Sequence, residues 1–162
     1  MKLDLNSYQG QRLPDWAAAA TAGFAAGAVL MVLELFWSAL VSGNSPWAVS
    51  HMIAAIVIGP TTLQSADFAF EVIAIALVAH YVLGVIFGLV LAVLIAAFRL
   101  DSSAAMVAVA GAVFGLALYL LNFYGMSHFF AWLVDWRSLQ ALVTHLIFGM
   151  TAALFYRKLN RG

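Results

Sequence analysis

Residues 68–98 read FAFEVIAIALVAHYVLGVIFGLVLAVLIAAF, and the only Asp, Glu, Lys or Arg among them is Glu71, close to the start. An α-helix needs about 20 apolar residues to cross a hydrocarbon core of about 30 Å. This run is longer than a perpendicular crossing requires, so we expect a tilted membrane-spanning helix. The stretch therefore predicts a membrane protein rather than a soluble one.

The rest of the chain has the same character, since 65% of its 162 residues are hydrophobic and 9% are charged. Soluble domains are about half apolar and a quarter charged. We therefore predict an all-α membrane protein whose partner is the lipid bilayer, with one four-helix transmembrane domain over residues 16–157. A segment at 1–15 and a tail at 158–162 flank it. Three more apolar runs supply the remaining spans: 16–41, 104–124 and 139–156.

Basic residues predict the orientation of these spans. Four spans place both termini on one side, and all but one of the seven Lys and Arg residues fall on that side. Because positive loops stay in the cytoplasm, both termini are expected to be cytoplasmic. The formal net charge of zero gives no sign of nucleic-acid binding. The basic residues expected on the cytoplasmic side are Lys2, Arg12, Arg99, Arg157, Lys158 and Arg161. The exception is Arg137, which is expected on the outer side.

The longest connection, at about 44–62, contains an apolar stretch that is too short to span the bilayer. Pro46 precedes this stretch and Gly59-Pro60 closes it. We expect a short interfacial or re-entrant helix at the outer mouth of the bundle.

The spans show an internal similarity. Residues 22–27 (AGFAAG) match residues 110–115 (AGAVFG), and residues 79–84 (AHYVLG) match residues 144–149 (THLIFG). The matched spans run in the same direction, so the pattern predicts two parallel-repeat helical hairpins.

Glycines recur at helical spacing on these spans, and small residues allow close approach of membrane helices. We interpret them as helix-packing positions rather than as a ligand-binding loop. They are Gly23, Gly27, Gly84, Gly88, Gly111, Gly115 and Gly149.

Polar residues share faces with these glycines. At 1.5 Å per residue, Glu34, His80 and His145 lie at a similar depth, about 12–13 Å from the outer ends of their spans. Asn122 matches Glu34 in the repeat and is expected in the same layer. Buried ionisable groups in membranes are candidates for function, so these four residues are candidate cofactor-binding residues. The alternative is that they are polar contacts between helices and nothing more.

Several ligands fit this layer. His80 and His145 could be the axial ligands of a haem b, which needs no cysteine, and the chain has none. They could also hold a metal, although Glu34 is the only carboxylate at that depth. On the outer side, His51 and His128 are candidates for a separate site or are hydrogen-bonded interface residues.

No nucleotide-binding loop, zinc-protease motif or nucleophile elbow occurs, so we expect no enzyme activity from the chain on its own. The leading hypothesis is an accessory subunit of a larger, respiratory membrane complex, packed against other membrane subunits or against copies of itself. The alternatives are a membrane cytochrome with bis-histidine haem b, and a stand-alone small transporter or channel that uses Glu34. The segments 85–98 and 150–155 contain no ionisable group, which argues against a path for ions across the whole membrane.

Residues 115–125 (GLALYLLNFYG), 144–149 (THLIFG) and 58–60 (IGP), with Ala79-His80, carry a resemblance to a known family. The chain resembles small bacterial four-helix inner-membrane proteins that are often labelled sodium:proline symporter-like. The resemblance implies four helices and a location in the bacterial inner membrane, and it implies no established activity or catalytic residue.

Overall fold

The computed structural model describes residues 13–41, 43 and 45–160 of the chain. Within these ranges the structure is helical and contains no strand. The α-helices are α1 (Trp16–Leu40), α2 (Ala48–Ile58), α3 (Phe70–Phe98), α4 (Ala104–Leu120) and α5 (Leu139–Leu159). The shorter turns are η2 (Pro60–Gln64), η3 (Leu121–Gly125), η4 (Met126–His128) and η5 (Ala131–Trp136).

Four of these helical segments are long and apolar enough to cross a membrane: α1, α3, α5, and α4 together with η3 and η4. The prediction of an all-α membrane bundle is confirmed. The predicted ends of the spans agree with the helices to within four residues. The helix α5 continues to Leu159, so the predicted tail begins as helix. The connection at 44–62 contains the expected short helix, α2.

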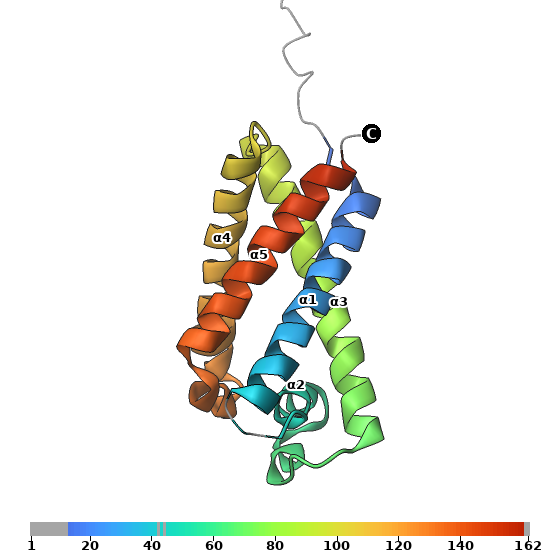
Figure 1. Ribbon diagram of the computed structural model, residues 1–162, viewed down its shortest axis with the longest axis vertical. Coiled ribbons are helices and arrows are strands. Elements are labelled where there is room, and N and C mark those ends of the chain that lie inside the picture. Colours follow the sequence, from blue (N-terminus) through green and yellow to red (C-terminus); the bar gives the residue numbers. More distant parts are fainter. Residues whose placement is uncertain (1–12, 42, 44, 161–162) are drawn as a thin grey trace, which may run out of the picture.

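The helices form two antiparallel pairs, α1 with α3 and α4 with α5, and α1 packs against α5 between them (Figure 1). The start of α1, the α3–α4 turn and the end of α5 lie at one end of the bundle, called the terminal end here. The helix α2 lies at the other, loop end with η2 to η5 (Figure 1). The helices α3 and α4 are close at the terminal end and diverge toward the loop end, and few contacts join them.

Two clusters of buried residues fill the bundle. The terminal cluster contains many alanines, which let the helices approach closely. The loop cluster is smaller and packs α2 against the end of α4. The terminal cluster consists of Ala18, Ala19, Ala22, Ala26, Leu30, Leu91, Ala92, Ile95, Val107, Phe114, Leu118, Phe148, Ala152, Ala153 and Tyr156. The loop cluster consists of Val49, Met52, Tyr119, Phe123 and Leu133.

Polar residues cap three of the spans. Asp15 accepts a hydrogen bond from the Ala18 amide at the start of α1. Ser103 and Ser138 do the same for α4 and α5. Such caps satisfy amide groups that the first helical turn leaves unpaired. The caps therefore fix where these spans begin.

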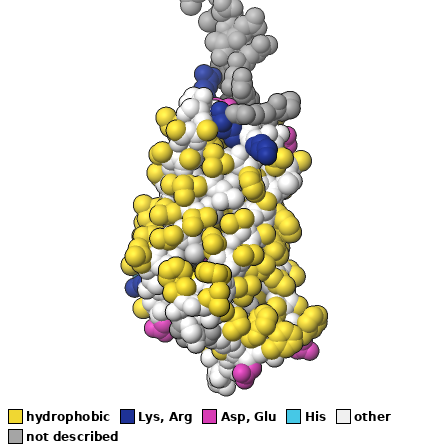
Figure 2. Space-filling model, in the orientation of Figure 1, with side chains coloured by type: hydrophobic (Ala, Val, Ile, Leu, Met, Phe, Trp, Pro, Cys, Tyr) yellow, Lys and Arg dark blue, Asp and Glu magenta, His cyan; other side chains and the backbone are white. Residues whose placement is uncertain are grey.

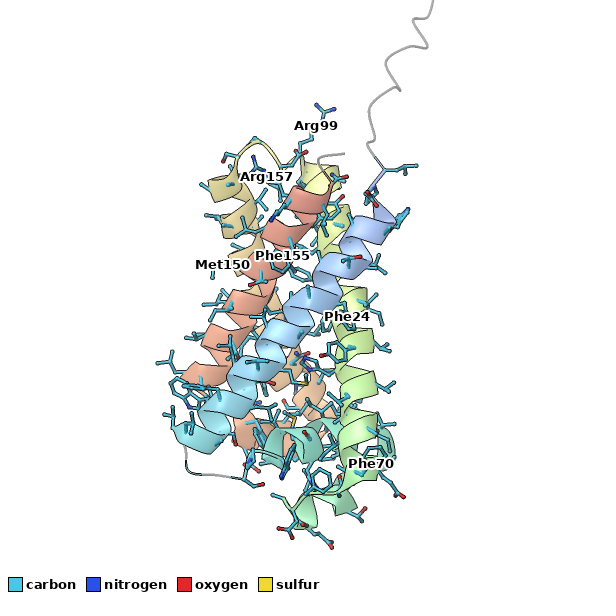
Figure 3. The ribbon with its side chains drawn as sticks, turned by 45° about the vertical axis from the view of Figure 1, so that its right-hand side comes forward. Phe24, Phe70, Arg99, Met150, Phe155 and Arg157 are labelled. Carbon is cyan, nitrogen blue, oxygen red and sulfur yellow. The ribbon has the colours of Figure 1, made fainter. Side chains whose placement is uncertain are left out.

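Charge is distributed unequally between the two ends. Figure 2 shows Lys and Arg gathered at the terminal end, and apolar side chains covering the length of the bundle. Figure 3 places Arg99 and Arg157 at that end and Phe70 at the loop end. This distribution agrees with four spans that return the chain to the side where it began. Three residues used in the orientation argument lie outside the described residues: Lys2, Arg12 and Arg161.

Candidate functional site

Glycines bring the helices of each pair into backbone contact. A Cβ atom added at Gly88 would lie 2.6 Å from the Cα of Gly23 in the α1/α3 pair. A Cβ atom added at Gly149 would collide with the carbonyl oxygen of Gly111 and lie 2.8 Å from the amide nitrogen of Gly115 in the α4/α5 pair. Real Cβ atoms do not approach backbone atoms this closely, so both crossings need glycine.

Gly27 and Gly84 are less crowded. A Cβ atom at Gly84 would lie 3.1 Å from the Gly23 carbonyl oxygen. One at Gly27 would meet nothing nearer than the His80 ring at 3.7 Å, which is ordinary contact. The space at Gly27 belongs to a cavity, described next.

A cavity of about 340 Å³ lies between the terminal and loop clusters. Ligand pockets in proteins are typically about 300–1,000 Å³. Its lining includes Glu34 from α1, His80 from α3, Asn122 from η3 and His145 from α5. The structure thus brings together the four residues that the sequence analysis placed in one layer.

The remaining walls of the cavity are apolar. Three phenylalanines and two methionines contribute, one of the methionines from α2. Leu83 of α3 and Leu121 of η3 also line the cavity while 39% and 49% of their surfaces are exposed. The helices α3 and α4 make few contacts with each other. The aromatic and sulfur-containing residues are Met52, Phe87, Phe123, Met126 and Phe148.

His80 is held by the backbone of the neighbouring helix. Its Nε2 lies 2.8 Å from the carbonyl oxygen of Gly27. A carbonyl oxygen can only accept, so Nε2 carries the proton and donates it. In a neutral imidazole the other nitrogen, Nδ1, is then an acceptor. No described residue hydrogen-bonds to Nδ1.

His145 has both ring nitrogens engaged. Its Nδ1 donates to the carbonyl oxygen of Ala141, at 2.7 Å on its own helix. Its Nε2 is therefore an acceptor, and the Asn122 amide group, at 3.1 Å, donates to it. This arrangement leaves Oδ1 of Asn122 without a hydrogen-bond partner among the described residues.

Glu34 has neither a hydrogen bond nor an ion pair with any described residue. The unpaired atoms of Glu34, His80 and Asn122 are not sealed in the interior. Among the described side chains, the fully buried polar atom without a partner is Nε1 of Trp132, elsewhere in the fold. The three residues that carry these unpaired groups all line the cavity.

A π-helical turn, η3, carries Asn122, and π-turns often occur at functional sites. Arg137 braces this turn, because its Nε donates to the carbonyl oxygen of Phe123 at 2.8 Å. Its guanidinium also donates to Ser127 at 3.0 Å and lies 4.2 Å from the centre of the Tyr124 ring. This role of Arg137 was not predicted from the sequence. The signal that could have revealed it is that Arg137 alone among the Lys and Arg residues is placed on the outer side.

A haem held by both histidines would have to displace existing bonds, since the Nε2 atoms of His80 and His145 are both hydrogen-bonded. The described residues also contain no group of three or more His, Cys, Asp or Glu side chains that could hold a metal ion. Haem b and metal binding at these residues stay predictions, and the observed geometry favours neither.

The two outer histidines lie in different surroundings. His51 of α2 is buried, with ring nitrogens 2.6 Å from the Thr62 carbonyl oxygen and 2.9 Å from that of Asp67. It ties the connection after α2 back onto that helix. His128 is exposed on η4. Of the two alternatives, the contacts of His51 agree with a hydrogen-bonded structural residue.

The fold and the cavity define the class: this is a multi-pass helical membrane protein with a cavity between its helix pairs. No protein-family model matches the chain, and neither a curated protein nor a solved structure shows significant similarity to it. The family resemblance drawn from the sequence therefore stays a prediction.

Proposed function

We propose that this protein is a membrane subunit that binds a small lipid-soluble ligand in the cavity between its two helix pairs. The observation that supports this proposal is the cavity of about 340 Å³ with polar groups on apolar walls. Binding sites for small molecules have this composition, in which a few polar groups orient a ligand that apolar walls enclose. Such a ligand would enter from the bilayer past Leu83 and Leu121, which line the cavity and are partly exposed.

The proposal includes a larger membrane complex as the setting. The described chain outside the spans consists of the short helix α2, short helical turns and their connections, so catalysis has little room apart from the cavity. Apolar side chains cover the outside of the bundle and suit packing against other membrane subunits or another copy (Figure 2). We place the protein in a bacterial inner membrane with both termini in the cytoplasm, from the positive residues at the terminal end. A respiratory complex is the partner that this proposal favours.

Extraction of the purified protein with organic solvent tests for the ligand. The protein is isolated in a mild detergent, and the extract is analysed by mass spectrometry for a compound bound in stoichiometric amount. Leu83→Trp should fill the cavity mouth and remove the compound. Val82→Trp is the matched control, because Val82 is exposed on the same helix and does not line the cavity. Equal retention of the compound by both variants would contradict the proposed site.

The native mass of the same preparation tests the setting. A stable assembly containing other membrane proteins supports an accessory subunit. A defined assembly of this chain alone, with the ligand bound, would keep the binding site and refute the larger complex.

A small transporter that uses Glu34 is the second candidate. The observation that favours it is the absence of any hydrogen-bond partner for Glu34 among the described residues. Between the cavity and the terminal end, however, the helices contain no Asp, Glu, Lys, Arg or His at residues 17–33, 85–98, 104–118 and 146–155. Flux measurements on proteoliposomes test this candidate, since Glu34→Gln should abolish transport if a carboxylate is essential, whereas Glu71→Gln should not.

A further inference from the structure

The polar atoms left unpaired in the cavity share one chemical property. Nδ1 of His80 and Oδ1 of Asn122 can only accept hydrogen bonds, given the partners that their other atoms have. The carboxyl group of Glu34 has two acceptor oxygens, and a proton on it would add a single donor. The cavity therefore offers acceptors in excess of donors.

The donors that could have balanced these acceptors are already used. Nε2–H of His80 is committed to the Gly27 carbonyl, and Nδ1–H of His145 to the Ala141 carbonyl. The Asn122 amide donates to His145. A ligand whose polar atoms only accept would leave the unpaired groups of the cavity without partners, and that costs binding free energy.

The apolar walls restrict the shape of the ligand. Phe87, Phe123 and Phe148 line the same cavity, and aromatic side chains pack well against a planar ring. Met52 and Met126 add sulfur atoms, which also make favourable contacts with rings. A ring therefore suits this cavity better than a branched polar headgroup does.

We infer that the ligand is a lipid-soluble hydroquinone, an aromatic ring with hydroxyl donors and an apolar tail, which enters between α3 and α4. Its two hydroxyl groups donate to two of the acceptors offered by Glu34, His80 and Asn122. Its ring lies against the phenylalanines, and its tail leaves past Leu83 and Leu121. The inference rests on the proposed function, because it assigns the ligand of the same cavity. A phospholipid headgroup fits less well, since its phosphate carries several acceptor oxygens and the cavity has at most one spare donor, a proton on Glu34.

The experiment compares two forms of one molecule that differ in donors. The protein is reconstituted in phosphatidylcholine nanodiscs without oxygen, and binding of decyl-benzoquinol and of decyl-benzoquinone is measured above the partition into empty nanodiscs. The dimethyl ether of the quinol is the third probe, because it keeps the ring and lacks the hydroxyl hydrogens. We expect the quinol to bind at least about ten-fold more tightly than either of the others, since a site built for donors rejects an analogue without them.

A variant that changes acceptors into a donor sharpens the test. Glu34→Gln keeps the shape of the side chain and adds an NH₂ group, so the preference should shift toward the quinone by about ten-fold. Glu71→Gln is the matched control, because Glu71 is exposed at the start of α3 and does not line the cavity. It should leave the preference unchanged.

The outcomes separate this inference from the proposed function. If the quinone or the ether binds as tightly as the quinol, the assignment of a hydroquinone is wrong, and a ligand site in the cavity remains. If all three probes bind and Leu83→Trp does not weaken their binding, the cavity is not the binding site. No binding of any probe, from a protein that still yields a stoichiometric compound on extraction, overturns the hydroquinone alone.

Discussion

The two helix pairs have similar backbones and different polar chemistry. In each pair glycines bring two antiparallel helices together, at Gly23 and Gly88 in one and at Gly111 and Gly149 in the other. In the α4/α5 pair the two polar side chains bond to each other. In the α1/α3 pair the histidine bonds to the backbone instead, and Glu34 is left without a partner.

Under the proposed function, this difference separates a pair whose polar groups serve the structure from a pair whose polar groups serve the ligand. A hydrogen bond between helices stabilises a membrane bundle by about 0.6 kcal/mol on average. An unpaired carboxyl group stabilises nothing and has a cost in an apolar setting. An unpaired carboxyl group at the cavity is therefore what the proposed ligand site predicts. The common ancestry of the two pairs stays a prediction, because parallel glycine contacts alone do not establish a duplication.

The largest loss of stability should come from changes at the glycine contacts that both pairs share. Gly149→Ala places a methyl group against the backbone of Gly111, and Gly88→Ala places one against Gly23. Backbone atoms cannot move aside as a flexible side chain does, so each variant should lose about 3 kcal/mol or more of its free energy of unfolding. Reversible unfolding in dodecylmaltoside and SDS mixed micelles measures the loss.

Gly27→Ala is the control for these variants. Its added methyl group meets the His80 ring at ordinary distance, so the change in unfolding free energy should stay below about 1 kcal/mol. An equal loss at Gly27 and Gly149 would refute the assignment of the crowded crossings.

The next effect should distinguish the two pairs. A double-mutant cycle of Asn122→Ala and His145→Ala should give a coupling free energy of about 0.6–1.7 kcal/mol, because their side chains bond to each other. The same cycle for Glu34→Ala and His80→Ala should give a coupling near zero, since no hydrogen bond joins them. Equal couplings would remove the asymmetry on which the proposed site depends.

The sequence was sufficient for the fold because long apolar runs determine membrane spans with little ambiguity. It also placed Glu34, His80, Asn122 and His145 at one depth, since the helical rise converts residue number into depth. The sequence does not determine how each helix is turned about its own axis. For that reason, neither the hydrogen bond from Asn122 to His145 nor the unpaired state of Glu34 was predictable. The π-turn was missed because one extra residue in a helical turn leaves no mark on hydropathy.

A smaller loss of stability should follow when the contacts of Arg137 with that π-turn are removed. Arg137→Met removes the hydrogen bond to the Phe123 carbonyl and the contact with Tyr124, so unfolding free energy should fall by about 1 kcal/mol. Amide exchange should rise within Leu121–Gly125. Arg157→Met at the terminal end is the control, and it should leave exchange in that turn unchanged. Unaltered exchange in Arg137→Met would show that Arg137 does not hold the turn.

The smallest effect on stability should come from substitutions of Glu34. The comparison of the two pairs indicates that this residue contributes least to folding. Glu34→Gln should change the free energy of unfolding by less than about 0.5 kcal/mol, because no hydrogen bond to a described residue is lost. Glu34→Leu should raise it, because an apolar side chain then replaces a polar one among apolar walls. If the Glu34→Leu variant is more stable and no longer binds the ligand, the Glu34 carboxyl group serves binding rather than folding. If Glu34→Leu unfolded instead, Glu34 would be part of the structure, and the α1/α3 pair would resemble the α4/α5 pair in chemistry as well as in backbone.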